Sequence, residues 1–228
     1  NARDEATTGD LVKYVVKNDL VGVKNSLNNG AAIDGIINGY TPLMIASEKG
    51  FIGLVRYLIS KGANINVIAS TTALIQAINF GHKEIAKMLI LKGADVNAYP
   101  SNFHFAGNAI FFAVKKKNLE IVKLLLKYAA NVNVVNCNST TPLFYADDIA
   151  IFKTLISAGA NVNHENVNGY TPIMAEIMAG NLIKIKILLK AGAKLNHRNR
   201  YGETAYKIAL QKNKYDIAKY LKSIGATE

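Results

Sequence analysis

The stretch GYTPLMIASEKGFIGLVRYLISKGANIN, residues 39–66, decides the fold, because much of the remaining sequence repeats it with substitutions. Its Thr-Pro pair at positions 41–42 predicts the start of a helix, since threonine caps a helix N-terminus and proline fits the first turn. Gly50 ends that helix, and a second apolar-periodic helix follows over residues 52–61. Gly62 suits the left-handed residue that closes a helix. The unit is therefore helix, turn, helix, loop.

Copies of this unit recur along almost the whole chain. They open at Thr41, Thr72, Asn108, Thr141, Thr171 and Thr204, with spacings of 31, 36, 33, 30 and 33 residues. Neither helix of one copy can bury its apolar face alone, so the copies must stack. The predicted fold is an all-α solenoid of helix-turn-helix units with loop or hairpin fingers, in one array. The expected segments are a disordered tail at 1–8 and repeats at about 9–34, 39–66, 70–97, 106–133, 139–163, 169–196 and 202–226.

The unit resembles the ankyrin repeat, in which a TPLH-type turn opens the first helix. The resemblance rests on TPLMIASEKG with LVRYLISKGANIN, GYTPIMAEIMAGN with KILLKAGAKLN, TALIQAINFGH with AKMLILKGADVN, and TPLFYA with LISAGANVN. It covers roughly residues 9–226. The fourth motif residue, usually histidine in the family, is here Met44, Ile75, Phe111, Phe144, Met174 and Lys207. The hydrogen bonds of that histidine to the turn are therefore expected to be absent or replaced.

Two copies depart from the regular spacing. The loop AYPSNFHFAGN, residues 98–108, is long and carries Tyr99, Phe103, His104 and Phe105. Such aromatic groups either anchor a partner or fold over the seam between two repeats. In the repeat at 139–163, the segment DDIAIFK replaces the usual glycine-containing turn and makes the repeat three residues shorter. This predicts a shortened inner helix or a tighter turn there.

Glu176 breaks the pattern of the first helices. The other full repeats have a small residue at this position, namely Ala46, Ala77, Ala113, Ala146 and Ala209. A carboxylate at a seam between helices must be paired or reach water, because an unpaired buried charge is costly. The sequence therefore predicts either a locally opened seam or a lysine partner for Glu176.

The chain is basic, with 27 Lys and Arg against 16 Asp and Glu. Residues 181–222 hold eleven of the basic residues against Glu203 and Asp216. Such a field attracts polyanions, which makes nucleic acid or an acidic surface the alternative partner. However, the lysines of LIKIKILLK alternate with apolar residues at helical spacing, as on a solvated outer face. Composition drift in an AT-rich genome gives the same excess.

Little in the sequence suggests catalysis. The histidines, at positions 82, 104, 164 and 197, are scattered, and His82 fits a structural place beside a glycine turn. Cys137 is the single cysteine, which excludes an intramolecular disulfide and favours a reducing compartment. Cys137 and His164 as nucleophile and base lack an orienting third group. No phosphate loop or zinc motif occurs, and no apolar run is long enough to span a membrane. The prediction is no enzyme, no cofactor, no metal site and no membrane insertion.

The resemblance implies a non-catalytic scaffold that binds a partner protein on its concave face and loop fingers. We expect a cytoplasmic monomer. The family also includes bacterial and viral proteins that act inside host cells, and the abundance of Lys, Asn, Ile and Tyr favours such an origin and a host cytosol. Carried over by motif position, the expected partner-binding residues are Tyr40, Glu48, Lys49, Ile68, Asn79, Phe80, Tyr99, Phe103, His104, Phe105, Lys115, Lys116, Tyr170, Met178, Arg200 and Tyr201. We place the centre at Phe80, Lys115 and Lys116.

Overall fold

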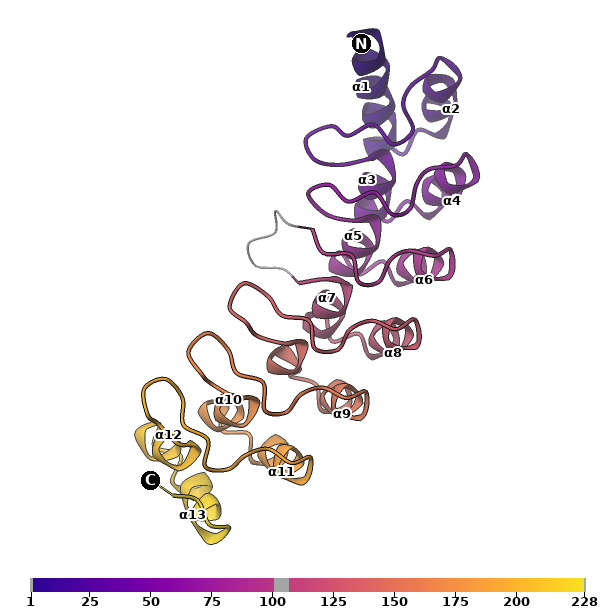
Figure 1. The fold of residues 1–228 in the computed structure, drawn as a ribbon. Helices are drawn as coiled ribbons and strands as arrows, with labels where there is room; N and C mark the ends of the chain where they lie inside the picture. The colour runs from indigo at the N-terminus through magenta and orange to yellow at the C-terminus, as the bar shows by residue number, and fades with distance from the viewer. Residues whose placement is uncertain (1, 101–106, 228) are drawn as a thin grey trace. The chain divides into compact units, whose positions relative to one another are not determined.

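The computed structural model describes residues 2–100 and 107–227, which form helices joined by turns and longer loops (Figure 1). The chain divides into two compact units, residues 1–131 and 132–228. The first unit contains α1 (Ala2–Val16), α2 (Leu20–Asn28), α3 (Pro42–Lys49), α4 (Ile52–Ser60), α5 (Ala73–Asn79), α6 (Lys83–Leu91), α7 (Ala109–Lys115) and α8 (Leu119–Lys127). The second contains the 3-10 helix η1 (Pro142–Tyr145), α9 (Ile149–Ser157), α10 (Pro172–Ala179), α11 (Leu182–Lys190), α12 (Ala205–Gln211) and α13 (Tyr215–Ser223). The expected all-α repeat fold is confirmed.

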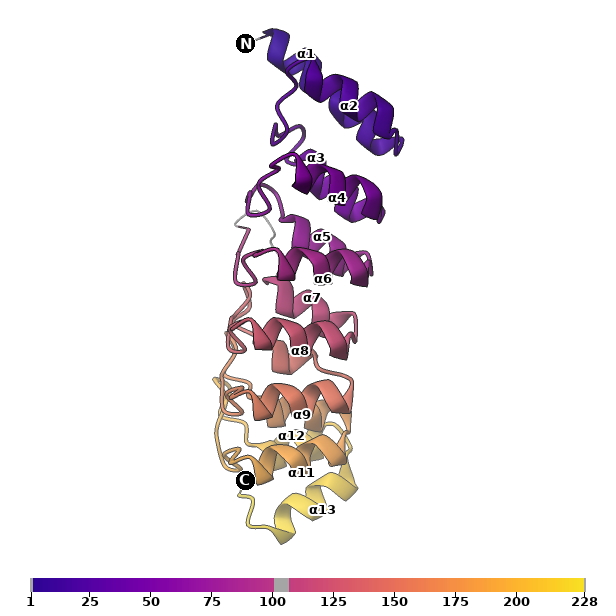
Figure 2. The ribbon, with the colours of Figure 1, turned by 90° about the vertical axis from the view of Figure 1, so that its right-hand side faces the viewer.

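Each unit has two layers of helices (Figures 1 and 2). In the first unit, α1, α3, α5 and α7 pack in sequence as the inner helices, and α4, α6 and α8 pack as outer helices. In the second unit, α10 packs between η1 and α12, while α11 and α13 pair with α10 and α12. Ala46, Ala77 and Ala113 lie fully buried on successive inner helices. Their small size allows the backbones to approach, as the repeat pattern predicts.

The motif threonine caps α3, α5 and α12 through its side chain as expected, whereas Thr141 and Thr171 precede their helices without such a hydrogen bond. Thr41 Oγ1 accepts a hydrogen bond from the Met44 N–H at 3.2 Å, and Pro42 occupies the first turn. The Thr41 N–H in turn donates to Met44 Sδ at 3.5 Å. A thioether sulfur is a weak acceptor. In this repeat, the hydrogen bond of the family's usual histidine is therefore replaced by a weaker one to methionine.

The shortened repeat has the predicted irregularity. Its inner helix is the four-residue 3-10 helix η1, and the outer helix α9 follows almost at once. Asp148 Oδ1 caps α9 by accepting from the N–H groups of Ala150 and Ile151, both at 2.9 Å. The Tyr145 hydroxyl accepts a hydrogen bond from Asn136 Nδ2 at 2.9 Å, which ties the end of η1 to the preceding loop. The shortened inner helix is confirmed.

The N-terminal segment differs from the prediction. Helix α1 begins at Ala2, so residues 2–8 are helical and do not form the disordered tail expected from their lack of periodicity. Thr8 is buried, and its Oγ1 accepts a hydrogen bond from the Ala32 N–H at 3.3 Å. The contact joins positions 24 residues apart. Long-range contacts of this kind leave no periodic signal in the local sequence.

Asparagines near the end of each outer-helix loop join successive repeats. Asn163 Nδ2 donates to the Gly192 carbonyl at 3.0 Å, while its Oδ1 accepts from the Lys194 N–H at 2.8 Å. Asparagine suits this place because its amide carries a donor and an acceptor side by side. The same pair of hydrogen bonds is made by Asn66, Asn97, Asn133 and Asn196.

Candidate functional site

The C-terminal ends of the inner helices in the first unit present the expected central residues. Phe80 follows α5 and is 52% exposed. The equivalent positions on the neighbouring inner helices are Lys49 on α3 and Lys116 after α7, both exposed. The turn after α5 abuts the end of α3, because His82 Nε2 contacts the Glu48 carbonyl at 2.7 Å. An aromatic ring is thus displayed between two lysines on stacked helices.

The charges around Phe80 are not equivalent. Lys49 Nζ lies 3.7 Å from Glu48 Oε1, so that ammonium is partly compensated. Lys116 is exposed and has no carboxylate within ion-pair distance in the described part of the chain. Asn79 is half-buried, and Lys115 is exposed at the end of α7. The surface therefore offers an apolar anchor with a cationic side toward α7.

The fingers of the first unit add apolar groups. Tyr40 is half-buried and forms a small bridge with Ile37, while Ile68 on the next finger is 52% exposed. The two fingers are joined by the Ser70 N–H, which donates to the Gly39 carbonyl at 3.2 Å. Tyr99, at the start of the long loop, is 42% exposed. The other three aromatic residues expected there, Phe103, His104 and Phe105, lie outside the described residues.

The fingers of the second unit are built on asparagine. Asn166 Oδ1 accepts from the N–H groups of Asn168 and Tyr170, and Asn199 Oδ1 accepts from those of Tyr201 and Glu203, at 2.9 to 3.0 Å. Each side chain closes a tight turn by satisfying two backbone donors. The Arg200 N–H then donates to the Asn168 carbonyl at 3.1 Å, which joins the two fingers.

These fingers display the tyrosines predicted for the partner site. The rings of Tyr170 and Tyr201 lie with centroids 6.4 Å apart, and Tyr201 is 64% exposed. The Tyr170 hydroxyl donates to Glu203 Oε2 at 3.1 Å. Burial, and then the Glu203 carboxylate, raise the pKa of Tyr170, so its hydroxyl stays a donor. Arg200 is exposed beside them, and Met178 at the end of α10 is 37% exposed.

The predicted site residues therefore fall into two sets. The larger set, centred on Phe80, belongs to the first unit. Tyr170, Met178, Arg200 and Tyr201 belong to the second unit. As their positions in the repeat motif predict, the residues of both sets that the structure describes lie at inner-helix ends or on fingers.

Each histidine of the described residues contacts a backbone carbonyl of a neighbouring repeat or finger. His164 Nε2 contacts the Ser139 carbonyl at 2.8 Å, and His197 Nε2 contacts the Gly169 carbonyl at 3.0 Å, in the manner of His82 and Glu48. This confirms the structural place expected for His82. Cys137 is exposed on a finger, and His164 Nε2 is directed to a carbonyl rather than to a thiol. Across residues 2–100 and 107–227, no three His, Cys, Asp or Glu side chains gather as metal ligands.

We predict that His82→Ala lowers the free energy of unfolding by about 1 kcal/mol, the value of one hydrogen bond, because it removes the contact to the Glu48 carbonyl. Urea denaturation followed by circular dichroism measures the loss. Lys83→Ala, one residue further and exposed, is the control and should change stability by less than about 0.5 kcal/mol. Equal losses in the two variants would show that the contact contributes nothing.

Fewer lysines of the second unit's basic helices are free to bind a polyanion than the sequence suggests. Lys184 is not on a solvated face: it is 4% exposed, and its Nζ lies 3.3 Å from Glu176 Oε1. The predicted lysine partner of Glu176 is thus confirmed, and the outward orientation expected for Lys184 is wrong. Lys186 lies over the Tyr220 ring at 5.1 Å, and Lys222 lies over Tyr206 at 5.2 Å. Several of these cations therefore have partners within the unit.

Lys184 occupies a position that is apolar in the other outer helices. Its column contains Leu54, Ile85, Ile121, Ile151 and Ile217, all buried. A lysine in an otherwise buried column requires a counter-charge, and Glu176 supplies it. Leu91 departs from its column in the same way: it is 64% exposed, whereas the other outer helices end in Asn28, Ser60, Lys127, Ser157, Lys190 and Ser223. The sequence interpretation missed both departures.

Stacked helix-turn-helix units with asparagine bridges and projecting fingers define a helical repeat protein. The family model for ankyrin repeats, in three copies, matches residues 5–100, 99–166 and 146–227. The chain therefore belongs to the ankyrin repeat family, whose repeats generally mediate protein–protein interaction. A comparison with curated proteins gave no match. Among the described residues, no helix combines the length and apolarity needed to cross a membrane.

Proposed function

We propose that this chain is a protein-interaction module whose inner-helix ends and fingers bind a partner protein, with Phe80 as the main anchor. The exposed ring between Lys49 and Lys116 carries the proposal. Aromatic residues dominate binding energies at interfaces because they bury much area at little conformational cost. A suitable partner places an apolar pocket over Phe80 and a carboxylate near Lys116.

A protein partner accounts for this surface better than a polyanion does. Nucleic acid is held mainly through contacts of Lys and Arg with phosphates. The center of the proposed site is instead an aromatic ring, and the most basic helices include the buried Lys184. The proposal places the monomeric protein in a cytoplasm, and in that of a host cell if the chain is of bacterial or viral origin.

We predict that Phe80→Ala weakens binding of the partner by about 1 to 2 kcal/mol, the range of an interface anchor. The partner is first captured from cell lysate on the immobilised chain and identified by mass spectrometry, and its purified form is then titrated by calorimetry. Tyr215→Ala is the control, because Tyr215 is a 65% exposed aromatic residue on an outer helix. Equal affinities of the Phe80→Ala variant and the unmodified chain would contradict the proposed anchor.

A salt titration separates the two partner classes. Binding of duplex DNA falls with salt at a log-log slope of about 0.9 per phosphate neutralised. The test variant reverses Lys186, Lys190 and Lys194 to glutamate, since all three are exposed and Lys184 is not. We expect little change in affinity for the protein partner. Tight DNA binding that is lost in this variant and kept in Phe80→Ala would support the polyanion alternative.

A further inference from the structure

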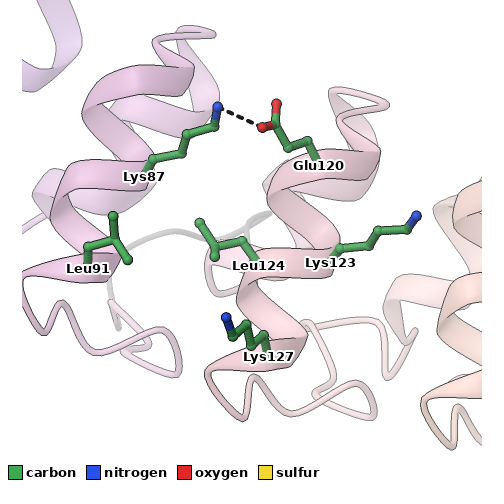
Figure 3. Close-up of a pocket in the computed structure, with 6 residues that line it drawn as sticks. All are labelled: Lys87, Leu91, Glu120, Lys123, Leu124 and Lys127. Carbon is green, nitrogen blue, oxygen red and sulfur yellow. Dashed lines mark ion pairs between the residues drawn. The ribbon is translucent and has the colours of Figure 1, made fainter.

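The outer helices of the first unit carry two adjoining hollows that share Lys87 and Leu91. One, of about 390 Å³, lies between α6 and α8 (Figure 3). Leu91 and Leu124 point toward each other across it. The other, of about 430 Å³, lies between α4 and α6 and is lined by Ile52, Met88 and Leu91 among others. Leu91 thus lies between the two hollows, and its side chain with those of Ile52, Met88 and Leu124 forms what we call the apolar strip of the outer helices.

Leu91 is the feature that distinguishes this strip. At 64% exposed, it stands where the other outer helices end in a polar residue, which is asparagine on α2 and serine or lysine on the rest. A comparable hollow of about 470 Å³ lies between α9 and α11 in the second unit, where Ser157 and Lys190 occupy this position. Size alone therefore does not set the first pair apart. A single exposed leucine is ordinary, but Leu91 adjoins Leu124 on one side and Ile52 and Met88 on the other, and contiguous apolar groups of this kind mark interaction sites.

The rim of the strip is basic. It carries Arg56, Lys87, Lys92, Lys123 and Lys127, against Glu84 and Glu120. Both glutamates are bonded to Lys87, whose Nζ lies 2.6 Å from Glu120 Oε1 and 3.2 Å from Glu84 Oε1. The other four cations have no ion pair in the parts of the chain that the structure describes. The apolar strip is therefore bordered by cations that lack a counter-charge.

We propose that this outer face is a second interaction surface, separate from the inner-helix site, that binds an acidic amphipathic helix carrying two large apolar side chains seven residues apart. Adjacent packed helices lie about 8–10 Å apart, so the two hollows are separated by about that distance. Side chains seven residues apart on one helix face are separated by about 10.5 Å. In an extended strand, neighbouring side chains on one face are only about 7 Å apart. Helical spacing matches the hollows, and acidic flanks match the four cations.

The probe is a synthetic helical peptide of about 18 residues, with two leucines seven positions apart, glutamates beside them and alanines elsewhere. Its binding to the whole chain is followed by fluorescence anisotropy, and the contacted residues are located from amide chemical shifts of the labelled chain. Two further peptides serve as controls: one carries lysine in place of glutamate, and one carries serine in place of leucine. We expect the acidic peptide to shift amides of α4, α6 and α8.

Two variants of the chain test the two parts of the surface. Leu91→Ser and the double variant Lys123→Glu/Lys127→Glu should each weaken binding of the acidic peptide by about tenfold or more. The matched controls are Ile183→Ser, at an outer-helix position that is 63% exposed, and Lys153→Glu/Lys190→Glu, which alters the hollow of the second unit. Both controls should bind as the unmodified chain does. Phe80→Ala should also bind normally, so this test is independent of the inner-helix site.

Several results would overturn the proposal. They are absence of binding, equal binding of the lysine or serine peptide, and shifts confined to the ends of α3, α5 and α7. Unchanged affinity in Leu91→Ser would also do so. If duplex DNA shifts the same amides and Leu91→Ser leaves its affinity unchanged, the cations bind polyanions and the apolar strip has no part in recognition.

Discussion

Replacing Lys184 by isoleucine alone is expected to lower the free energy of unfolding by about 3 to 5 kcal/mol at neutral pH, the cost of leaving one partner of a buried ion pair uncompensated. The side chains of Lys184 and Glu176 are only 5% and 10% exposed, and their charged atoms lie 3.3 Å apart. Lys184 Nζ also lies 5.0 Å from the centre of the Phe152 ring. Without the lysine, the buried Glu176 carboxylate has lost its counter-charge and still feels the repelling charge of Asp147. Urea denaturation measures the loss.

The double variant Glu176→Ala/Lys184→Ile is the decisive comparison. It restores the residue types that the other full repeats have, alanine on the inner helix and leucine or isoleucine on the outer one. Exchanging a buried ion pair for apolar residues is often neutral or stabilising by about 1 to 4 kcal/mol. We therefore expect the double variant to be at least as stable as the unmodified chain. A double variant as unstable as Lys184→Ile would show that apolar packing cannot replace the pair.

The pH dependence follows from the Glu176 carboxyl. Burial raises its pKa above the ordinary value of 4.5, and attraction to Lys184 opposes this only in part. The pKa of Glu176 is therefore higher in the folded chain than in the unfolded chain. The stability contributed by the protonated carboxyl is fully present below pH 4.5 and is lost as the pH rises through the folded-state pKa. In Lys184→Ile the opposing attraction is gone, so the deficit relative to the unmodified chain should grow with pH. A deficit that is constant between about pH 4 and 8 would contradict this origin.

The repeat pattern predicted the inner and outer helices because each is specified by local signals. Thr41 and Pro42 start α3, and Gly50, with a backbone φ of 76°, ends it. The missing residues before Leu155 likewise predicted the shortened helix η1. Such features depend on neighbours in the sequence, so they can be derived without coordinates.

The errors concern contacts between repeats. The helical residues 2–8 include a buried Thr8 that accepts a hydrogen bond from a residue 24 positions away. The alternation of lysines with apolar residues in α11 predicts a solvated Lys184, whereas the equivalent residues of the other outer helices are apolar and buried. The motif position of Phe80, the proposed anchor, predicts an inner-helix end, and the structure shows Phe80 exposed there. Which partner it binds depends on surfaces that the repeat motif does not specify.

Asn163→Ala is expected to lower the free energy of unfolding by about 1 to 3 kcal/mol, because it removes two hydrogen bonds between successive repeats, each worth about 0.5 to 1.5 kcal/mol. Asn168→Ala is the control, since the Asn168 backbone, rather than its side chain, bonds to Arg200. Repeat arrays are stabilised by interfaces between neighbours, so a weakened interface should also reduce cooperativity. We expect a shallower urea transition in Asn163→Ala. In the control, the free energy of unfolding and the steepness of the transition should both stay unchanged. A steep transition at the unmodified midpoint would mean that the Asn163 bridge is dispensable and that apolar packing alone joins these repeats.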